Sequence, residues 1–117
     1  MMDVSLIGVS ASFAAMGGIA LVDPPRITRY FGISVLTSDM RNEIRAVYGG
    51  FGVAIAVMLI ATSGTELAVG VRYTIAAALL GMAAGRAIGF CIERSGRWPW
   101  IFGALEIVGA LALTRVS

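Results

Sequence analysis

Long apolar stretches fill most of this chain, and they constrain its fold more than any other feature. Hydrophobic residues make up 58% of the 117 residues and charged residues only 14%, whereas about a quarter of the residues in a soluble domain are charged. A helix needs about 20 apolar residues to cross roughly 30 Å of hydrocarbon. We therefore expect an integral membrane protein with room for about four such helices and no separate soluble domain.

Proline and polar turns divide the apolar sequence into helices. Pro24 and Pro25 end the first stretch, because proline lacks a backbone donor and restricts the residue before it. The polar turn 62–66 separates the second stretch from the third. The segment 25–31 mixes arginines with aromatic residues, which suits a short helix in the membrane interface. The predicted fold is all-α, a four-transmembrane-helix antiparallel bundle in a single membrane domain of residues 1–117, with helices at about 4–22, 39–62, 68–92 and 98–113 and the interfacial helix at about 25–31.

Arginine positions predict how this bundle is oriented. The connections after the first and third helices hold Arg26, Arg29, Arg41, Arg94 and Arg97, and the opposite side holds Arg72 and Arg115. Because cytoplasmic connections are enriched in Lys and Arg, we expect both termini on the non-cytoplasmic side. The long side chain at the start of the third helix, that of Arg72, is expected to snorkel to the membrane surface.

Several reactive side chains are absent from the sequence. There is no histidine, no lysine and a single cysteine, Cys91. These absences exclude an internal disulfide, a CxxC redox pair and a cysteine-built metal cage, as well as imidazole ligands and Schiff-base chemistry. We expect no metal, no cofactor and no nucleic-acid partner. An enzyme is disfavoured, and the form left open is a membrane enzyme whose Glu/Arg/Tyr cluster performs acid and base work on a lipid.

Four charged residues lie at or within the apolar stretches, where a charge costs several kcal/mol unless it is paired or functional. They are Glu43, Arg45, Arg86 and Glu106. Arg86 lies seven residues before Glu93, and Glu106 lies eight residues after Trp98, so the two are about 10 and 12 Å from the same membrane side. Consecutive helices joined by a short turn are antiparallel neighbours. The sequence therefore predicts an Arg86–Glu106 ion pair, which either only fixes helix register or forms part of a ligand site.

The second apolar helix carries its two charges on different faces. Glu43 and Arg45 are two residues apart, so they point in roughly opposite directions. We expect one of them to meet the first helix or the interfacial segment, and the other to meet the third and fourth helices. Tyr48 lies one turn beyond Arg45, where it can make a structural hydrogen bond or donate to a ligand.

Glycines at helical spacing predict close helix contacts. The third helix carries a doubled GxxxG pattern, and other glycines flank Tyr48 and Glu106. The expected packing positions are Gly49, Gly50, Gly81, Gly85, Gly89 and Gly103.

The segment 41–50 reads Arg-Asn-Glu-Ile-Arg-Ala-Val-Tyr-Gly-Gly. It resembles the signature of a bacterial family of small four-helix membrane proteins that is known only as a domain of unknown function and is distantly similar to the DoxX and DoxD group. The resemblance extends over nearly the whole chain and implies a fold, a bacterial cytoplasmic (inner) membrane location and a set of matched positions, but no activity. The matched positions are Glu43, Arg45, Tyr48, Gly49, Gly50, Arg86 and Glu106.

Two further functions remain open from the sequence. The first is binding or transport of a small polar, anionic or lipid-like ligand at the buried polar cluster of Glu43, Arg45, Tyr48, Arg86 and Glu106. The alternative is an accessory or assembly subunit of a larger membrane complex, or a homo-oligomer, in which the charges are purely structural. In both cases the lipid bilayer is the expected surrounding.

Overall fold

The computed structural model describes residues 2–115, in which helices are joined by short loops and no strand occurs. The elements are α1 (Val4–Val22), α2 (Pro24–Thr28), the 3-10 helix η1 (Arg29–Phe31), α3 (Ser38–Ile44), the π-helix η2 (Arg45–Gly50), α4 (Phe51–Ala61), α5 (Ala68–Ile92) and α6 (Arg97–Thr114). Each expected helix range differs from these bounds by at most one residue, if α3, η2 and α4 are taken as one helix and α2 and η1 as another. The all-α prediction is confirmed.

Three helices are long and apolar enough to cross a membrane. They are Val4–Val22, Ser38–Ala61 and Ala68–Ile92 among the described residues, and the second of them runs unbroken through α3, η2 and α4. The fourth expected span, α6, carries Arg97 and Glu106 and is not among these three. The helices therefore indicate a membrane protein, whereas a count of four crossings stays a prediction.

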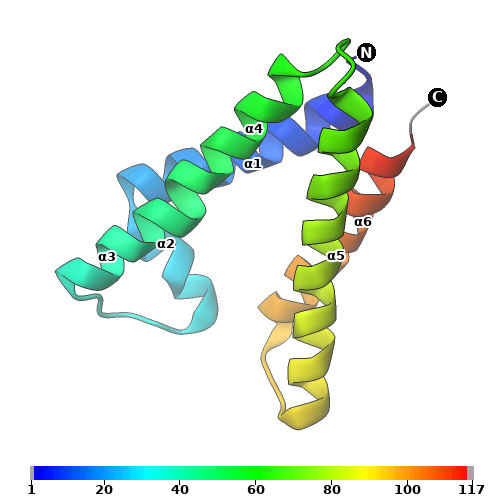
Figure 1. Cartoon of the computed structure of the whole chain (residues 1–117). Coiled ribbons are helices and arrows are strands. Elements are labelled where there is room, and N and C mark those ends of the chain that lie inside the picture. Colours follow the sequence, from blue (N-terminus) through cyan, green and yellow to red (C-terminus); the bar gives the residue numbers. More distant parts are fainter. Residues whose placement is uncertain (1, 116–117) are drawn as a thin grey trace.

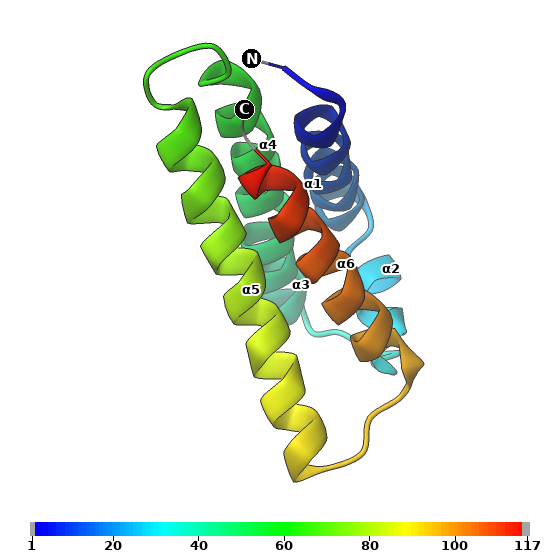
Figure 2. The ribbon, with the colours of Figure 1, turned by 90° about the vertical axis from the view of Figure 1, so that its right-hand side faces the viewer.

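The helices form two arms that meet at one end and separate toward the other (Figure 1). The first arm contains α1 and the α3–η2–α4 helix, and the second arm contains α5 and α6. Both termini and the turn between α4 and α5 lie at the end where the arms meet (Figures 1 and 2). A buried apolar cluster holds this junction together and consists of Leu59, Ile75, Ala76, Leu79, Ala110 and Leu113.

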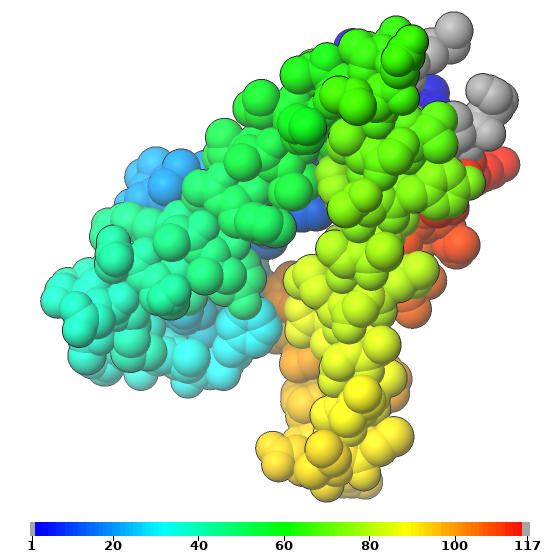
Figure 3. All heavy atoms as spheres, viewed as in Figure 1, coloured from blue at the N-terminus to red at the C-terminus, as the bar shows by residue number. Residues whose placement is uncertain are grey.

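A notch separates the arms on the side away from the junction (Figure 3). We call this notch, which lies between η2–α4 and α5, the wedge. The molecule measures 43 × 32 × 18 Å along its principal axes. The bundle is therefore splayed, because α4 and α5 meet only near the turn that joins them.

Within the first arm, glycines bring two backbones into direct contact. A Cβ atom added to Gly17 of α1 would lie 2.8 Å from the Gly49 carbonyl oxygen, and one added to Gly52 would lie 3.1 Å from the Phe13 carbonyl oxygen. A Cβ atom at Gly49 would lie 2.8 Å from the Leu21 side chain. This contact is the closest kind of helix packing, in which only glycine leaves room for the opposing main chain.

Other glycines expected at helix contacts do not pack closely within the chain. A Cβ atom added to Gly81, Gly85 or Gly89 would meet nothing within 4 Å, and at Gly50 the nearest atom, 3.8 Å away, is the Arg45 carbonyl oxygen of the same helix. A close helix contact at these four positions therefore stays a prediction, and the contacting helix would have to come from another chain.

A buried arginine reinforces the junction. Arg72 of α5 is 3% exposed, and its Nε and Nη2 atoms donate to the carbonyl oxygens of Leu113 (2.8 Å) and Ala112 (3.3 Å). Its Nη1 atom lies 3.5 Å from Oδ2 of Asp3, which caps α1 by accepting a 2.8 Å hydrogen bond from the Leu6 amide. The expectation that Arg72 snorkels to the surface is wrong. The side chain instead donates to carbonyl groups of the last turn of α6, of which that of Ala112 also accepts a 3.4 Å hydrogen bond from the Arg115 amide.

The short helices after α1 pack against the second arm. The Tyr30 ring of η1 makes edge contacts with Trp98 (4.7 Å between ring centroids) and Phe102 (5.7 Å) of α6, and Phe31 lies 5.7 Å from Phe102. Gly32 ends this segment in the left-handed region, with φ of 77°. The aromatic contact joins the arms on the side of the molecule where α2 and α6 are adjacent (Figure 2).

Candidate functional site

Arg86 of α5 and Glu106 of α6 form a two-point ion pair. The Arg86 Nε atom lies 2.8 Å from Glu106 Oε1, and the Arg86 Nη2 atom lies 2.9 Å from Oε2. The Glu106 side chain is 8% exposed and the Arg86 side chain 22%. Such parallel hydrogen bonds are the strongest arrangement for an arginine and a carboxylate. The predicted Arg86–Glu106 pair is confirmed.

The pair leaves part of the Arg86 guanidinium group available. A guanidinium group has five N–H donors, and two are used on Glu106. Phe102 lies beside the group, with its ring centroid 5.5 Å from Arg86 Cζ. Gly103 gives the Arg86 side chain room, because a Cβ atom there would lie 3.5 Å from Arg86 Cδ. Glu106 therefore neutralises Arg86 from one edge and leaves donors on the other.

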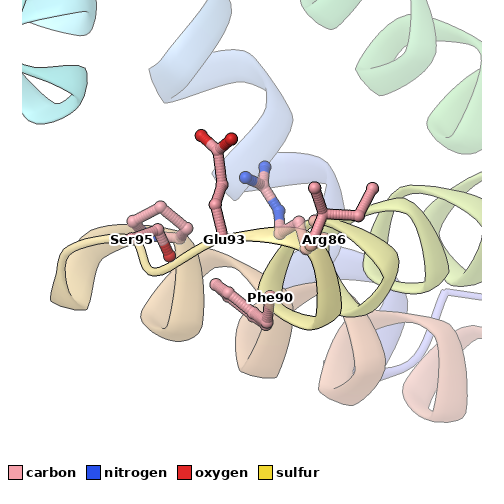
Figure 4. Close-up of a pocket in the computed structure, with 7 residues that line it drawn as sticks. Arg86, Phe90, Glu93 and Ser95 are labelled. Carbon is pink, nitrogen blue, oxygen red and sulfur yellow. The ribbon is translucent and has the colours of Figure 1, made fainter.

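Arg86 also lines a cavity at the end of the second arm. The cavity has a volume of about 340 Å³ and is lined by Arg86, Gly89, Phe90, Ile92, Glu93, Ser95 and Pro99. We call it the α5–α6 cavity. Arg86 and Glu93 extend from the same side of α5, toward the first arm, while Phe90 points away from them (Figure 4). The cavity is open to its surroundings over much of its surface, and its volume is at the low end of small-molecule sites, which is roughly 300–1,000 Å³.

An aromatic stack supports one wall of this cavity. Phe90 lies parallel to Trp100, with ring centroids 3.8 Å apart and an angle of 4° between the planes. A neighbouring hollow of about 310 Å³ is lined by Phe90, Glu93, Arg94, Ser95 and Trp100. The cavity thus combines one cation, one carboxylate and a flat apolar surface.

The remaining predicted site residues lie on the first arm. Arg45 Nε donates a 3.0 Å hydrogen bond to the Leu21 carbonyl oxygen at the end of α1, so Arg45 meets the first helix, as one of the two charges was expected to do. Glu43 is exposed at the surface of α3. Tyr48 is half-buried, and the described residues show no hydrogen bond between it and Arg86.

Arg45 and Tyr48 belong to an unusual stretch of helix, which begins directly after α3. Arg45–Gly50 is wound as a π-helix, in which the Phe51 amide donates to the Ala46 carbonyl oxygen five residues earlier. π-Helical turns occur frequently at functional sites. The five residues of the predicted cluster therefore do not form one site, because Arg86 and Glu106 meet each other whereas Arg45 binds α1 and Glu43 faces outward.

Sequence reasoning missed two polar features. The Asp3–Arg72 contact at the junction was not predicted, although Asp3 stands directly before the first apolar helix, where helix caps occur. The Ser10 hydroxyl of α1 is buried and has no hydrogen-bond partner among the described residues. Glu93 and Ser95 were not among the predicted site residues, yet both line the α5–α6 cavity. Within residues 2–115, no three His, Cys, Asp or Glu side chains come together as a metal site.

Comparison with protein families gives one match. Residues 1–116 match the model of the family described as Domain of unknown function (DUF4345). No curated protein and no solved structure matches the chain.

Proposed function

This chain belongs to the Domain of unknown function (DUF4345) family, and we propose that it binds the anionic group of a small polar or lipid-like molecule at Arg86. One observation carries the proposal: the Arg86 guanidinium group is fixed by Glu106 on one edge and reaches a cavity with donors to spare. A fixed guanidinium group that retains free donors is well suited to phosphate and carboxylate oxygens.

The neighbouring groups favour recognition over a purely structural pair. A structural pair needs only its two members, yet Glu93 and Ser95 add polar atoms to the same cavity and Phe90 adds a flat apolar wall. Binding sites of this kind combine an apolar lining with a few convergent polar groups. Transport would additionally require the arms to move, and binding is the step that this geometry supports.

We propose further that α6 is a fourth membrane crossing. It lies beside α5, and its only charge in the apolar part, Glu106, is neutralised by Arg86. Pairing removes most of the cost of placing a carboxylate in hydrocarbon. Together with the arginine distribution, this gives a four-helix protein of the bacterial cytoplasmic membrane with both termini on the non-cytoplasmic side. In a Cys91→Ser background, a single cysteine at Ser95 should react with a membrane-impermeant thiol reagent only from the cytoplasmic face.

The binding proposal is tested with two lipids that differ only in the phosphate. Purified protein in mild detergent is titrated with a short-chain phosphatidate and, in parallel, with diacylglycerol of the same chains. Phosphatidate should raise the unfolding midpoint progressively with concentration, because a ligand that binds only the folded state stabilises it. Diacylglycerol should have little effect.

The matched variant is Arg86→Gln/Glu106→Gln, which replaces the ion pair by two neutral amides that can still hydrogen-bond. It should remain folded and lose the response to phosphatidate. An equal response of this double variant and the unmodified protein would reject binding at Arg86.

A second function is favoured by a different observation. Gly81, Gly85 and Gly89 form a stripe along α5 with nothing within 4 Å of an added Cβ atom. Small-residue stripes let another membrane helix approach closely, so an accessory subunit or homo-oligomer would use this surface. Mass measurement of the detergent-purified protein tests self-association. An oligomer that Gly85→Leu converts to a monomer would support contact through the stripe. A monomeric unmodified protein, or an oligomer whose mass Gly85→Leu leaves unchanged, would reject it.

A further inference from the structure

We infer that the ligand is a glycerophospholipid whose headgroup carries a hydrogen-bond donor, with the headgroup held between Glu93 and Arg86 and the acyl chains in the wedge. The inference rests on the proposed function, since it names the class of molecule that supplies the anion for Arg86.

The order of side chains along α5 matches the order of groups along such a lipid. Starting from the free end of the second arm, one side of α5 presents Glu93, then Arg86, then Met82 and Leu79. The spacings of four and three residues keep Arg86, Met82 and Leu79 on one face. Glu93, the residue at which α5 ends, extends to the same side as Arg86 (Figure 4). A phospholipid presents in the same direction a headgroup donor, a phosphate and an acyl chain. Glu93 and Arg86 are about 10 Å apart along the helix axis, and both side chains are long enough to reach a shared ligand.

Space for the headgroup lies between the two charged residues. Gly89 falls on the same face, three residues after Arg86 and four before Glu93, and a Cβ atom added there meets nothing within 4 Å. The Glu93 carboxylate has no ion-pair partner among the described residues, although it lines the cavity with Arg86. A headgroup with a phosphate alone would bind at Arg86 more weakly because of this carboxylate. A headgroup with both a phosphate and a donor would satisfy both residues.

The wedge offers an apolar path for the chains. On α5 the path runs from Arg86 past Met82, which is 47% exposed, to Leu79 in the buried junction cluster. On the opposite wall, α4 contributes Leu59, which belongs to that cluster, and Ile55, which packs against it. The α5 wall therefore changes from polar near the open end to apolar at the junction. The arms are separated on this side, so a lipid can enter from the bilayer (Figure 3).

The deciding comparison uses two lipids with the same net charge. Phosphatidylethanolamine has an ammonium group with N–H donors, whereas phosphatidylcholine has a quaternary ammonium group with none. Native mass spectrometry of the protein released from detergent reports how much of each lipid is bound. We expect about tenfold tighter binding of phosphatidylethanolamine, as for one charge-assisted hydrogen bond in a partly dry site.

Two pairs of matched variants locate the lipid. Gly89→Leu should reduce binding of phosphatidylethanolamine at least fivefold, whereas Gly70→Leu, at an equally open position near the other end of α5, should leave it unchanged. Met82→Trp should reduce binding by filling the wedge. Leu80→Trp should not, because Leu80 is also 47% exposed but lies on the other side of the helix.

Glu93→Gln separates this inference from the proposed function. This variant should bind phosphatidylethanolamine and phosphatidylcholine with affinities within about twofold of each other, and it should still bind phosphatidate. If Glu93→Gln and Met82→Trp change nothing but Arg86→Gln/Glu106→Gln still abolishes phosphatidate binding, this inference is overturned and the proposed function stands. If the double variant retains phosphatidate binding, both this inference and the proposed function are rejected.

Discussion

Arg86 and Glu106 are twenty residues apart in the chain, yet their side chains meet through two parallel hydrogen bonds of 2.8 and 2.9 Å. This pair joins α5 to α6 between the α5–α6 cavity and the apolar junction, whose residue Ala110 is one turn from Glu106. It therefore holds the two helices of the second arm together next to the cavity.

Removing one member of this pair should destabilise the protein more than replacing both. Arg86→Gln leaves a buried carboxylate without a cation, which we expect to lower the free energy of unfolding by about 3 kcal/mol. Arg86→Gln/Glu106→Gln should lose less than half of that. Unfolding midpoints in mild detergent measure the difference, and equal losses in the single and double variants would contradict a direct interaction.

Stability should also depend on pH through Asp3. The pKa of Asp3 is held below its ordinary value of 3.8 by the hydrogen bond from the Leu6 amide and by the nearby Arg72 guanidinium group. Because the folded-state pKa is the lower one, the carboxylate contributes stability above the ordinary value and loses this contribution as the pH falls through the folded-state value. Unfolding midpoints should therefore fall below about pH 4. Asp3→Asn should be less stable at neutral pH and show less of this acid dependence.

Gly17 should tolerate no side chain, in contrast to its neighbour. Gly17→Ala places a Cβ atom 2.8 Å from main-chain atoms of Gly49 and Val53, and overpacking of this kind costs about 1–3 kcal/mol. Gly18→Ala has nothing within 4 Å and should be neutral or stabilising by up to about 1 kcal/mol, because alanine is the better helix former. A similar effect of the two substitutions on the unfolding midpoint would show that α1 and α4 do not pack through Gly17.

Tryptophan fluorescence should report a ligand in the α5–α6 cavity. The chain has two tryptophans, of which Trp100 stacks on the cavity residue Phe90 and Trp98 contacts Tyr30. Phosphatidate should change the emission of the unmodified protein and of Trp98→Phe, but not of Trp100→Phe. Loss of the signal in Trp98→Phe alone would place the ligand at the aromatic contact between the arms.

The sequence was a good guide wherever local signals decide the structure. Pro24 and the polar turn at 62–66 set helix ends, so the helix ranges could be derived from them. Counting residues from the turn at 93–97 put Arg86 and Glu106 at one level, and that depth argument needs no knowledge of the rest of the fold.

Relations between helices that are distant in the sequence could not be derived in this way. Arg72 binds the last turn of α6, forty-one residues further on at Leu113, and no periodicity indicates which helix end an arginine will meet. The glycine stripe of α5 illustrates the same limit, since GxxxG spacing predicts a close contact but not whether the partner is in the same chain. The π-helix at Arg45–Gly50 was also not predicted, because an apolar helix has the same composition in either winding.

The splay of the two arms has a mechanical consequence in a bilayer. A body whose helix pairs diverge toward one face takes up more area in one leaflet than in the other. Lateral pressure in the wider leaflet then pushes the arms together, whereas looser lipid packing lets them spread. The width of the wedge would thus respond to membrane curvature and lipid shape, within the limits set by the Arg72 contacts at the junction and the contacts of Tyr30 with Trp98 and Phe102.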